Sequence, residues 1–170
     1  ATFNSDVWVR EAGGGGRTNT MTDGNVIEKG GVAFSAVFGP VSEQMKTSLL
    51  VDGTEFFATG VSIVIHPSNP HVPIIHMNVR YFEYDNGKRY WFGGGIDLTP
   101  HYVVPEQAKS FHLSLKEICD KYNSEFYPKF KNWADDYFFQ PHRNETRGIG
   151  GIFYDHIDET SGLSKEQLLN

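Results

Sequence analysis

The Asn86-Gly87 pair is the sequence feature that most limits what this chain can fold into. Both residue types tolerate positive φ, so the pair favours a two-residue type I′ hairpin turn. Residues 74–84, before the turn, alternate apolar and polar side chains, as a half-buried strand does. We therefore expect an antiparallel hairpin whose register the turn fixes.

Three pairs that matter for function follow from this register: Arg80 opposite Gly93, Asn78 opposite Gly95, and His76 opposite Asp97. Opposite residues share a face of the sheet. The pattern predicts a polar face that is either a site or a solvated surface, and it does not decide between them. In the first case the two glycines would leave a flat floor for a ligand. A β-bulge in the triple glycine would instead turn Asp97 to the other face.

The rest of the chain indicates an α+β fold. Runs at 26–39 and 56–66 are rich in β-forming residues, so the first half is expected to be mostly strand. A helical period begins at Pro105, a second helix is expected after Pro128, and strand character returns at 147–157. Strands first and helices second predict helices against an antiparallel sheet. Ser164 and Gln167 have the spacing of a capping box and predict one more helix.

Composition excludes several classes of function. The net charge is -6 and no run of Lys or Arg occurs, which argues against nucleic acid or an anionic membrane as partner. No segment approaches the ~20 apolar residues of a membrane helix. The single Cys119 excludes an internal disulfide and a cysteine-based metal site within one chain. The single cysteine leaves the compartment open, although a reducing one fits. A length of 170 residues suits one domain.

Motifs for cofactors and nucleophiles are incomplete. The glycine run 13–16 lacks the Gly-Lys-Ser/Thr ending of a phosphate loop, and no dinucleotide fingerprint is complete. A triad of Ser62, His76 and Asp97 lacks a nucleophile elbow.

Other single residues have mainly structural interpretations. His112 falls in an apolar helical stripe, which favours a core histidine over a ligand. Arg143 and Arg147 suit either an anion site or, as we favour, surface ion pairs.

Four longer motifs carry a resemblance: "HPSNPHVPIIHMNVRYFEY", "YWFGGGIDLTP", "YPKFKNWADDYFF" and "HRNETRGIGGIFYD". From about Trp8 to Asp158 the chain closely resembles the oxygen-dependent coproporphyrinogen III oxidases. Family members are longer, so residues 1–170 are expected to be a single domain that lacks N-terminal and C-terminal parts of the family's domain. The resemblance implies a largely flat antiparallel sheet flanked by helices, in a homodimer.

The resemblance also implies an activity: oxidative decarboxylation of two propionates of coproporphyrinogen III to vinyl groups, giving protoporphyrinogen IX in haem biosynthesis. Molecular oxygen is the co-substrate, and no cofactor is required. The expected location is the cytoplasm, with mitochondrion and plastid as alternatives. The residues carried over are catalytic His76 (proton donor), Asp97 and Arg80; substrate-binding Ser62, Asn78, Val79 and Arg80; and, for a divalent metal in bacterial members, His66, His76, His112 and His142.

Two residues agree with this activity on chemical grounds. The planar fork of Arg80 fits a propionate carboxylate. Asp97 is suited to accept from pyrrole N–H groups, while the electron-rich macrocycle gives its own electrons to oxygen. The alternative is a non-catalytic haem or tetrapyrrole carrier that uses histidines as axial ligands. A carrier has little use for Asp97 near the ring nitrogens, which separates the two hypotheses.

Overall fold

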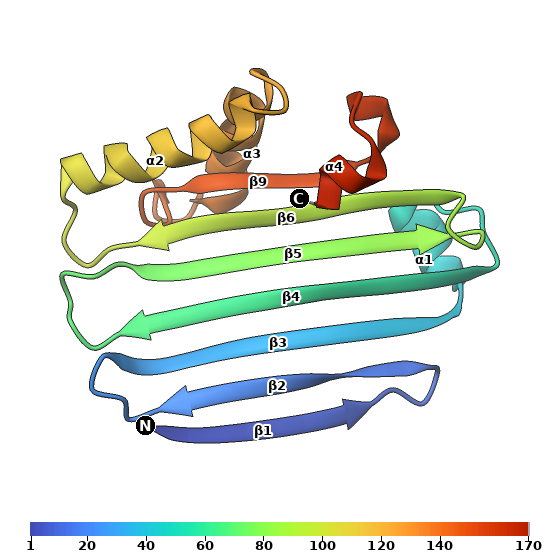
Figure 1. Ribbon diagram of the computed structural model, residues 1–170, viewed down its shortest axis with the longest axis horizontal. Helices are drawn as coiled ribbons and strands as arrows, with labels where there is room; N and C mark the ends of the chain where they lie inside the picture. The colour runs from blue at the N-terminus through green and yellow to red at the C-terminus, as the bar shows by residue number, and fades with distance from the viewer. Residues whose placement is uncertain (170) are drawn as a thin grey trace.

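A seven-stranded antiparallel sheet is the main element of the computed structural model, which describes residues 1–169 (Figure 1). Its strand order is β1-β2-β3-β4-β5-β6-β9, so neighbours along the chain are mostly neighbours in the sheet. The α+β class is confirmed.

The strands of this sheet are β1 Thr2–Val9, β2 Gly14–Thr22, β3 Ile27–Pro40, β4 Glu55–Pro67, β5 Ile74–Tyr84, β6 Arg89–Thr99 and β9 Gly151–Ile157; β7 Phe139–Gln140 and β8 Glu145–Thr146 form a separate ribbon. The helices are α1 Glu43–Leu49, α2 Pro105–Asp120, α3 Phe126–Phe138 and α4 Lys165–Leu169.

The β5–β6 hairpin has the predicted register. Its ladder pairs Arg80 with Gly93, Asn78 with Gly95 and His76 with Asp97. The turn is closed by the Lys88 amide, which donates to the Asp85 carbonyl at 3.3 Å. The bulge that would have turned Asp97 over lies instead on the other side of β6, between Phe92 and Gly94 in the pairing with β9. His76, Asn78 and Arg80 therefore share a face, which we call the platform face, with Asp97.

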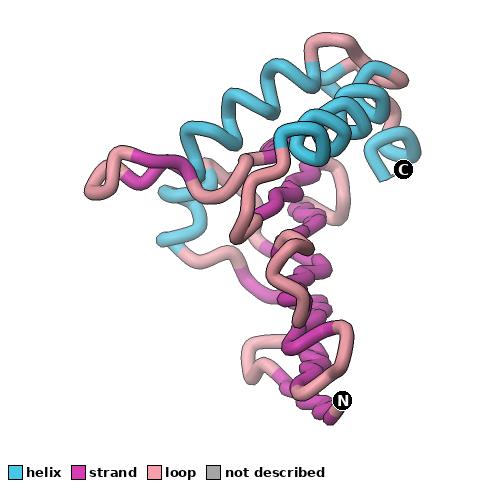
Figure 2. Tube along the Cα trace, turned by 90° about the vertical axis from the view of Figure 1, so that its left-hand side faces the viewer, coloured by secondary structure: helices cyan, strands magenta, loops and turns pink. Residues whose placement is uncertain are grey.

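The larger helices gather at one edge of the sheet rather than over its whole area. In Figures 1 and 2, α2 and α3 lie beside β9 and leave both faces of β1 to β3 uncovered. The end of β3 at Val37 packs against the cluster that includes α1. Helix α3 was expected after Pro128 and begins at Phe126, so that Pro128 lies within its first turn. Proline is accepted in the first turn because its missing N–H is not needed there. None of the described helices is long and apolar enough to cross a membrane.

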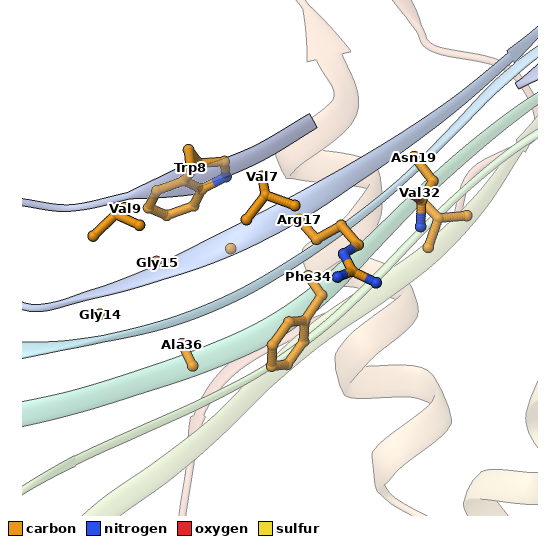
Figure 3. A pocket seen from close by; sticks show the side chains of 11 residues that line it. Val7, Trp8, Val9, Gly14, Gly15, Arg17, Asn19, Val32, Phe34 and Ala36 are labelled. Carbon is orange, nitrogen blue, oxygen red and sulfur yellow. The ribbon is translucent and has the colours of Figure 1, made fainter. Parts of the chain in front are cut away.

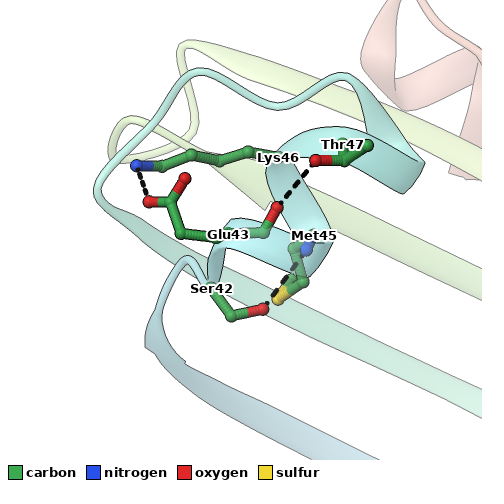
Figure 4. Close-up of polar contacts among 5 residues, drawn as sticks. All are labelled: Ser42, Glu43, Met45, Lys46 and Thr47. Atoms are coloured by element: carbon green, nitrogen blue, oxygen red, sulfur yellow. Dashed lines mark hydrogen bonds and ion pairs between the residues drawn. The ribbon is translucent and has the colours of Figure 1, made fainter.

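Helix α1 was not predicted from the sequence. Its first turn is capped by the Ser42 Oγ, which accepts from the Met45 amide at 3.2 Å, and the Lys46 ammonium lies 2.6 Å from a Glu43 carboxylate oxygen (Figure 4). The helix has seven residues, too few to show a helical period in the sequence. Leu49 packs with Met45 against a buried cluster on the platform face near the β5–β6 turn.

The predicted capping box of α4 is present. The Ser164 Oγ accepts from the Gln167 amide at 3.3 Å, and the Gln167 side-chain oxygen accepts from the Ser164 amide at 2.9 Å. The buried clusters lie around α1, α3 and β9, while Phe3 and Val9 on β1 are 74% and 85% exposed. The platform face is consequently covered at both ends of β5 and β6 and open over β2 to β4.

Candidate active site

Small side chains form a flat floor on the open part of the platform face. Ser35 pairs with Gly60, and Ala33 pairs with Ser62, so all four residues point to this face. They line a hollow of about 560 Å³ together with Trp8. No side chain of this floor extends beyond one heavy atom from Cβ, so a flat ligand has room to rest on the sheet. The alternation of small residues with Val32 and Phe34 is visible in the sequence, but we did not predict a binding floor from it.

The substrate-binding residues expected from the resemblance border this floor. Ser62 pairs with Asn78 and Gly60 with Arg80, so these side chains stand in adjacent rows on the platform face. Ser62, Asn78, Val79 and Arg80 line the same hollow. Val79 lies between two platform residues on β5 and its side chain therefore points to the opposite face. Its contribution to the hollow comes from its backbone.

Arg80 is held in one orientation by three neighbours. Its Nη2 lies 3.1 Å from an Asp155 carboxylate oxygen, and its Nη1 donates to the Asn78 side-chain oxygen at 3.2 Å. The guanidinium carbon lies 5.5 Å from the centre of the Phe153 ring. The side chain remains 41% exposed. The guanidinium is thus fixed in place while part of it still faces solvent, as a carboxylate-binding group requires.

The expected glycine floor over β6 is not open. A Cβ at Gly93 would lie 2.5 Å from an Asp155 oxygen and 2.6 Å from the Arg80 Nε, and a Cβ at Gly95 would lie 3.2 Å from the Phe153 ring. These glycines make room for the Arg80–Asp155 pair and for Phe153. The ligand floor is therefore displaced toward β3 and β4, because residues from β9, distant in sequence, fill the space over β6.

Asp97 lies at the other end of the polar row and is buried. The Arg147 Nη2 donates to both of its carboxylate oxygens at 2.9 Å. The His76 Nδ1 lies 3.3 Å from one of the same oxygens, but it lacks hydrogen-bond alignment and has no hydrogen-bond partner among residues 1–169. The Asp97 side chain is only 4% exposed, against 27% for His76. A buried carboxylate needs such a cation, because an unpaired buried charge is costly.

Arg147 is the residue of the candidate site whose partner the sequence analysis did not predict. We favoured surface ion pairs for Arg143 and Arg147, and this interpretation is confirmed only for Arg143, whose Nε lies 2.5 Å from an exposed Glu145 oxygen. Arg147 binds Asp97, 50 positions away in the chain. No local pattern marks a contact across that separation.

The four histidines expected at a metal do not meet in one place. His112 is a satisfied core residue: its Nε2 contacts the Ile149 carbonyl at 2.9 Å and its Nδ1 contacts the Tyr127 hydroxyl at 3.0 Å. His142 is exposed in the turn between β7 and β8. Within the described part of the chain no group of three or more His, Cys, Asp or Glu side chains could hold a metal ion. The histidine set therefore does not fit a metal centre in this structure.

The remaining pair, His66 and His76, shares the platform face, and the two side chains are near enough to interact electrostatically. Burial lowers the pKa of His66, and the nearby Lys29 lowers it further. His66 is therefore disfavoured as a cation. It lies on β4 beyond the floor and is not among the residues that line the hollow.

A larger hollow lies over β1 to β3, but its lining residues include few side chains that could act in catalysis. It measures about 640 Å³, and Figure 3 shows its lining of mainly apolar side chains such as Val7, Val9 and Phe34, with Arg17 beside them. Carboxylates and histidines are not among its lining residues. The candidate active site is therefore the hollow on the platform face, where the polar residues of β4 to β6 gather.

Comparison with known proteins identifies the family. The family model "Coproporphyrinogen III oxidase" matches residues 1–170. The chain is 52% identical to human oxygen-dependent coproporphyrinogen-III oxidase, mitochondrial, over 95% of its own length and 38% of the relative. It is 52% identical to the Drosophila melanogaster oxygen-dependent coproporphyrinogen-III oxidase, covering 92% of the chain and 43% of the relative. For the Prochlorococcus marinus enzyme of that name, the identity is 49%, covering 97% and 47%. The chain spans less than half the length of these relatives, and it belongs to the coproporphyrinogen III oxidase family.

Proposed function

We propose that the protein containing this chain catalyses the oxygen-dependent oxidative decarboxylation of two propionates of coproporphyrinogen III, giving protoporphyrinogen IX. The observation that carries this proposal is the fixed guanidinium of Arg80 at the border of a floor of small side chains. A tetrapyrrole with propionate side chains presents both features that such a site recognises, a broad ring system and carboxylates.

The residues of the site have distinct roles in this proposal. The ring system rests on Ser35, Gly60 and Ser62, and Arg80 binds a propionate with Asn78 beside it. Each conversion of a propionate to a vinyl group releases one CO₂, one proton and two electrons. Oxygen takes up the two electrons with that proton and a second proton, which His76 or water supplies, and is reduced to hydrogen peroxide. The substrate is then its own source of electrons, and the protein supplies binding, orientation and electrostatics.

His76 and Asp97 stand at the far end of the polar row. His76 is partly exposed and is the proposed proton donor, with the Asp97 carboxylate 3.3 Å from its Nδ1, where it would stabilise a protonated imidazole. The expectation that Asp97 accepts from pyrrole N–H groups requires Arg147 to move aside, because Arg147 covers the carboxylate. The geometry favours an action of Asp97 through His76 and Arg147.

The proposal is tested by turnover of coproporphyrinogen III on a full-length protein that contains this segment. Protoporphyrin fluorescence after oxidation of the product measures the rate, with and without a chelator. Oxygen-dependent product formation is expected in both conditions, because the histidines form no metal centre in the described residues. A protein that binds the tetrapyrrole without converting it would support the carrier function instead. Activity lost to the chelator and restored by one metal would show a metal requirement.

We further propose that this protein is a homodimer and is located in the cytoplasm. The uncovered apolar side chains of β1 and β3, such as Val9 and Phe34, support association with a second copy. Sedimentation of the full-length protein tests whether it is a dimer. The human relative is mitochondrial by name, so localisation of a fluorescently tagged full-length protein tests the proposed cytoplasmic location.

A further inference from the structure

A second guanidinium, that of Arg147, contacts Asp97 on the platform face, four residues along β6 from the position opposite Arg80. Arg147 contacts Asp97, whereas Arg80 stands opposite Gly93 on the same strand, β6. Four residues along a strand separate the Cα atoms of Gly93 and Asp97, which mark the positions of the two cations on β6, by roughly 13 Å. This spacing is comparable with the separation of carboxylates on neighbouring rings of the substrate.

The guanidinium groups of Arg80 and Arg147 are held by the same two kinds of contact, an aspartate and an aromatic ring. Each uses its Nη2 on an aspartate, Arg80 on Asp155 at 3.1 Å and Arg147 on Asp97 at 2.9 Å. Each guanidinium carbon also lies over an aromatic ring, that of Phe153 at 5.5 Å for Arg80 and that of Phe138 at 4.3 Å for Arg147. The two rings belong to one buried cluster that also contains Ala134. One rigid aromatic base therefore holds both guanidinium groups.

The Arg147 guanidinium retains capacity for another acceptor. Its side chain is 37% exposed, whereas its partner Asp97 is 4% exposed, so the cation is the member of the pair that reaches solvent. Within residues 1–169, Nη2 is the nitrogen that donates to a partner, and the buried Nε has none. The buried Nε is shielded from a ligand, so a ligand carboxylate would bind through Nη1, whose two N–H groups Asp97 does not use.

The loop that carries Arg147 is fixed against β6. The Ile149 amide donates to the Leu98 carbonyl at 3.0 Å, and His112 contacts the Ile149 carbonyl at 2.9 Å. Gly148 has a φ of +59° and leaves no space for a Cβ beside the Leu98 carbonyl. The cation is thus held in place before any ligand binds, which reduces the entropy that binding costs.

We propose that Arg147 binds a second carboxylate of the ligand whose first carboxylate Arg80 binds, with Asp97 as its positioning residue. This assignment rests on the proposed function, because it requires a ligand with at least two carboxylates. It gives the "RGIGG" motif at 147–151 a role: the glycines permit the close approach to β6 that places the guanidinium.

Steady-state kinetics of the full-length protein with coproporphyrinogen III test the assignment. Arg147→Gln should raise KM about ten- to a hundredfold, the effect of losing one charge-assisted hydrogen-bonded contact, while kcat changes less. The matched control is Arg143→Gln, which removes the same charge from an exposed pair in the neighbouring turn and should leave KM within about twofold. Arg147→Lys keeps a cation beside Asp97 without the fork and should give an intermediate KM.

The outcomes separate this assignment from the proposed function. A fall in kcat at unchanged KM in Arg147→Gln would mean that Arg147 only holds Asp97, and would overturn the assignment while the activity stands. No turnover by the unmodified full-length protein would overturn both. If Arg147→Gln fails to fold because Asp97 is left unpaired, the Arg147→Lys variant and the double variant Arg147→Gln with Asp97→Asn decide. An unchanged KM in either of them would overturn the assignment.

Discussion

Charged residues of the site come in fixed pairs, and this determines how single substitutions should act. Arg80 with Asp155 and Arg147 with Asp97 each combine an inward carboxylate with a more exposed guanidinium. The carboxylates keep the cations in position, since a charge that is already oriented loses little entropy when a ligand arrives. Substitution of an arginine should therefore weaken ligand binding directly. Substitution of a neighbouring small residue should weaken it by displacing the arginine side chain.

Replacement of Arg80 by lysine should weaken substrate use although the charge is kept. Lysine has no planar fork and cannot contact Asn78, Asp155 and the carboxylate of the proposed substrate together. We expect kcat/KM of Arg80→Lys in the full-length protein to fall about tenfold or more, through a higher KM. An unchanged kcat/KM would remove Arg80 from the site.

An alanine at Gly93 should disturb the Arg80–Asp155 pair without a direct contact to the ligand. The added Cβ would lie 2.5 Å from the Asp155 oxygen and 2.6 Å from the Arg80 Nε, so both side chains must shift. We expect a several-fold rise in KM for Gly93→Ala. The matched control is Gly31→Ala in the same sheet, where a Cβ meets nothing within 4 Å. Equal kinetics for the two variants would show that the pair tolerates displacement.

At the scale of elements, local signals were predictable and contacts between distant elements were not. The Asn86-Gly87 turn fixed the β5–β6 register, and a helical period located α2, because both signals act over a few residues. The cover over Gly93 and Gly95 comes from β9, and the partner of Asp97 comes from the loop before β9. These contacts depend on where β9 joins the sheet, which no short pattern specifies.

His112 connects two helices with the loop that carries Arg147, and its removal should therefore act on both stability and activity. His112→Ala leaves the Tyr127 hydroxyl and the Ile149 carbonyl without their partner and opens a cavity between α2 and α3. We expect a loss of about 1–3 kcal/mol in the free energy of unfolding, measured by urea denaturation, with reduced turnover. Metal content by elemental analysis should not change. One stoichiometric metal, lost in His112→Ala while the fold stays intact, would show instead that His112 is a ligand.

The whole molecule is asymmetric, with its covered core at β9 and an uncovered sheet at β1 to β3. Figure 2 shows this sheet extending away from the helices, and Figure 1 shows β1 at its outer edge. The predicted fold class is right, but the sequence did not indicate that the helices gather at one edge. Alternation along a strand tells which residues share a face, and it does not tell which element, if any, covers that face.

Residues 1–170 expressed alone should associate in solution. The face of the sheet opposite the platform face exposes apolar side chains, and β1 has an open edge. Phe3, Val7 and Phe34 are 74%, 61% and 48% exposed. Apolar area of this kind is normally covered by another part of a protein or by a second subunit, and an unpaired edge strand adds hydrogen-bonding groups. Sedimentation velocity should show dimers or larger species that increase with concentration. Val7→Lys with Phe34→Lys should shift the distribution toward monomer, whereas Thr18→Lys, on the platform face, should shift it less. A concentration-independent monomer for the unmodified segment would show that this surface does not drive association.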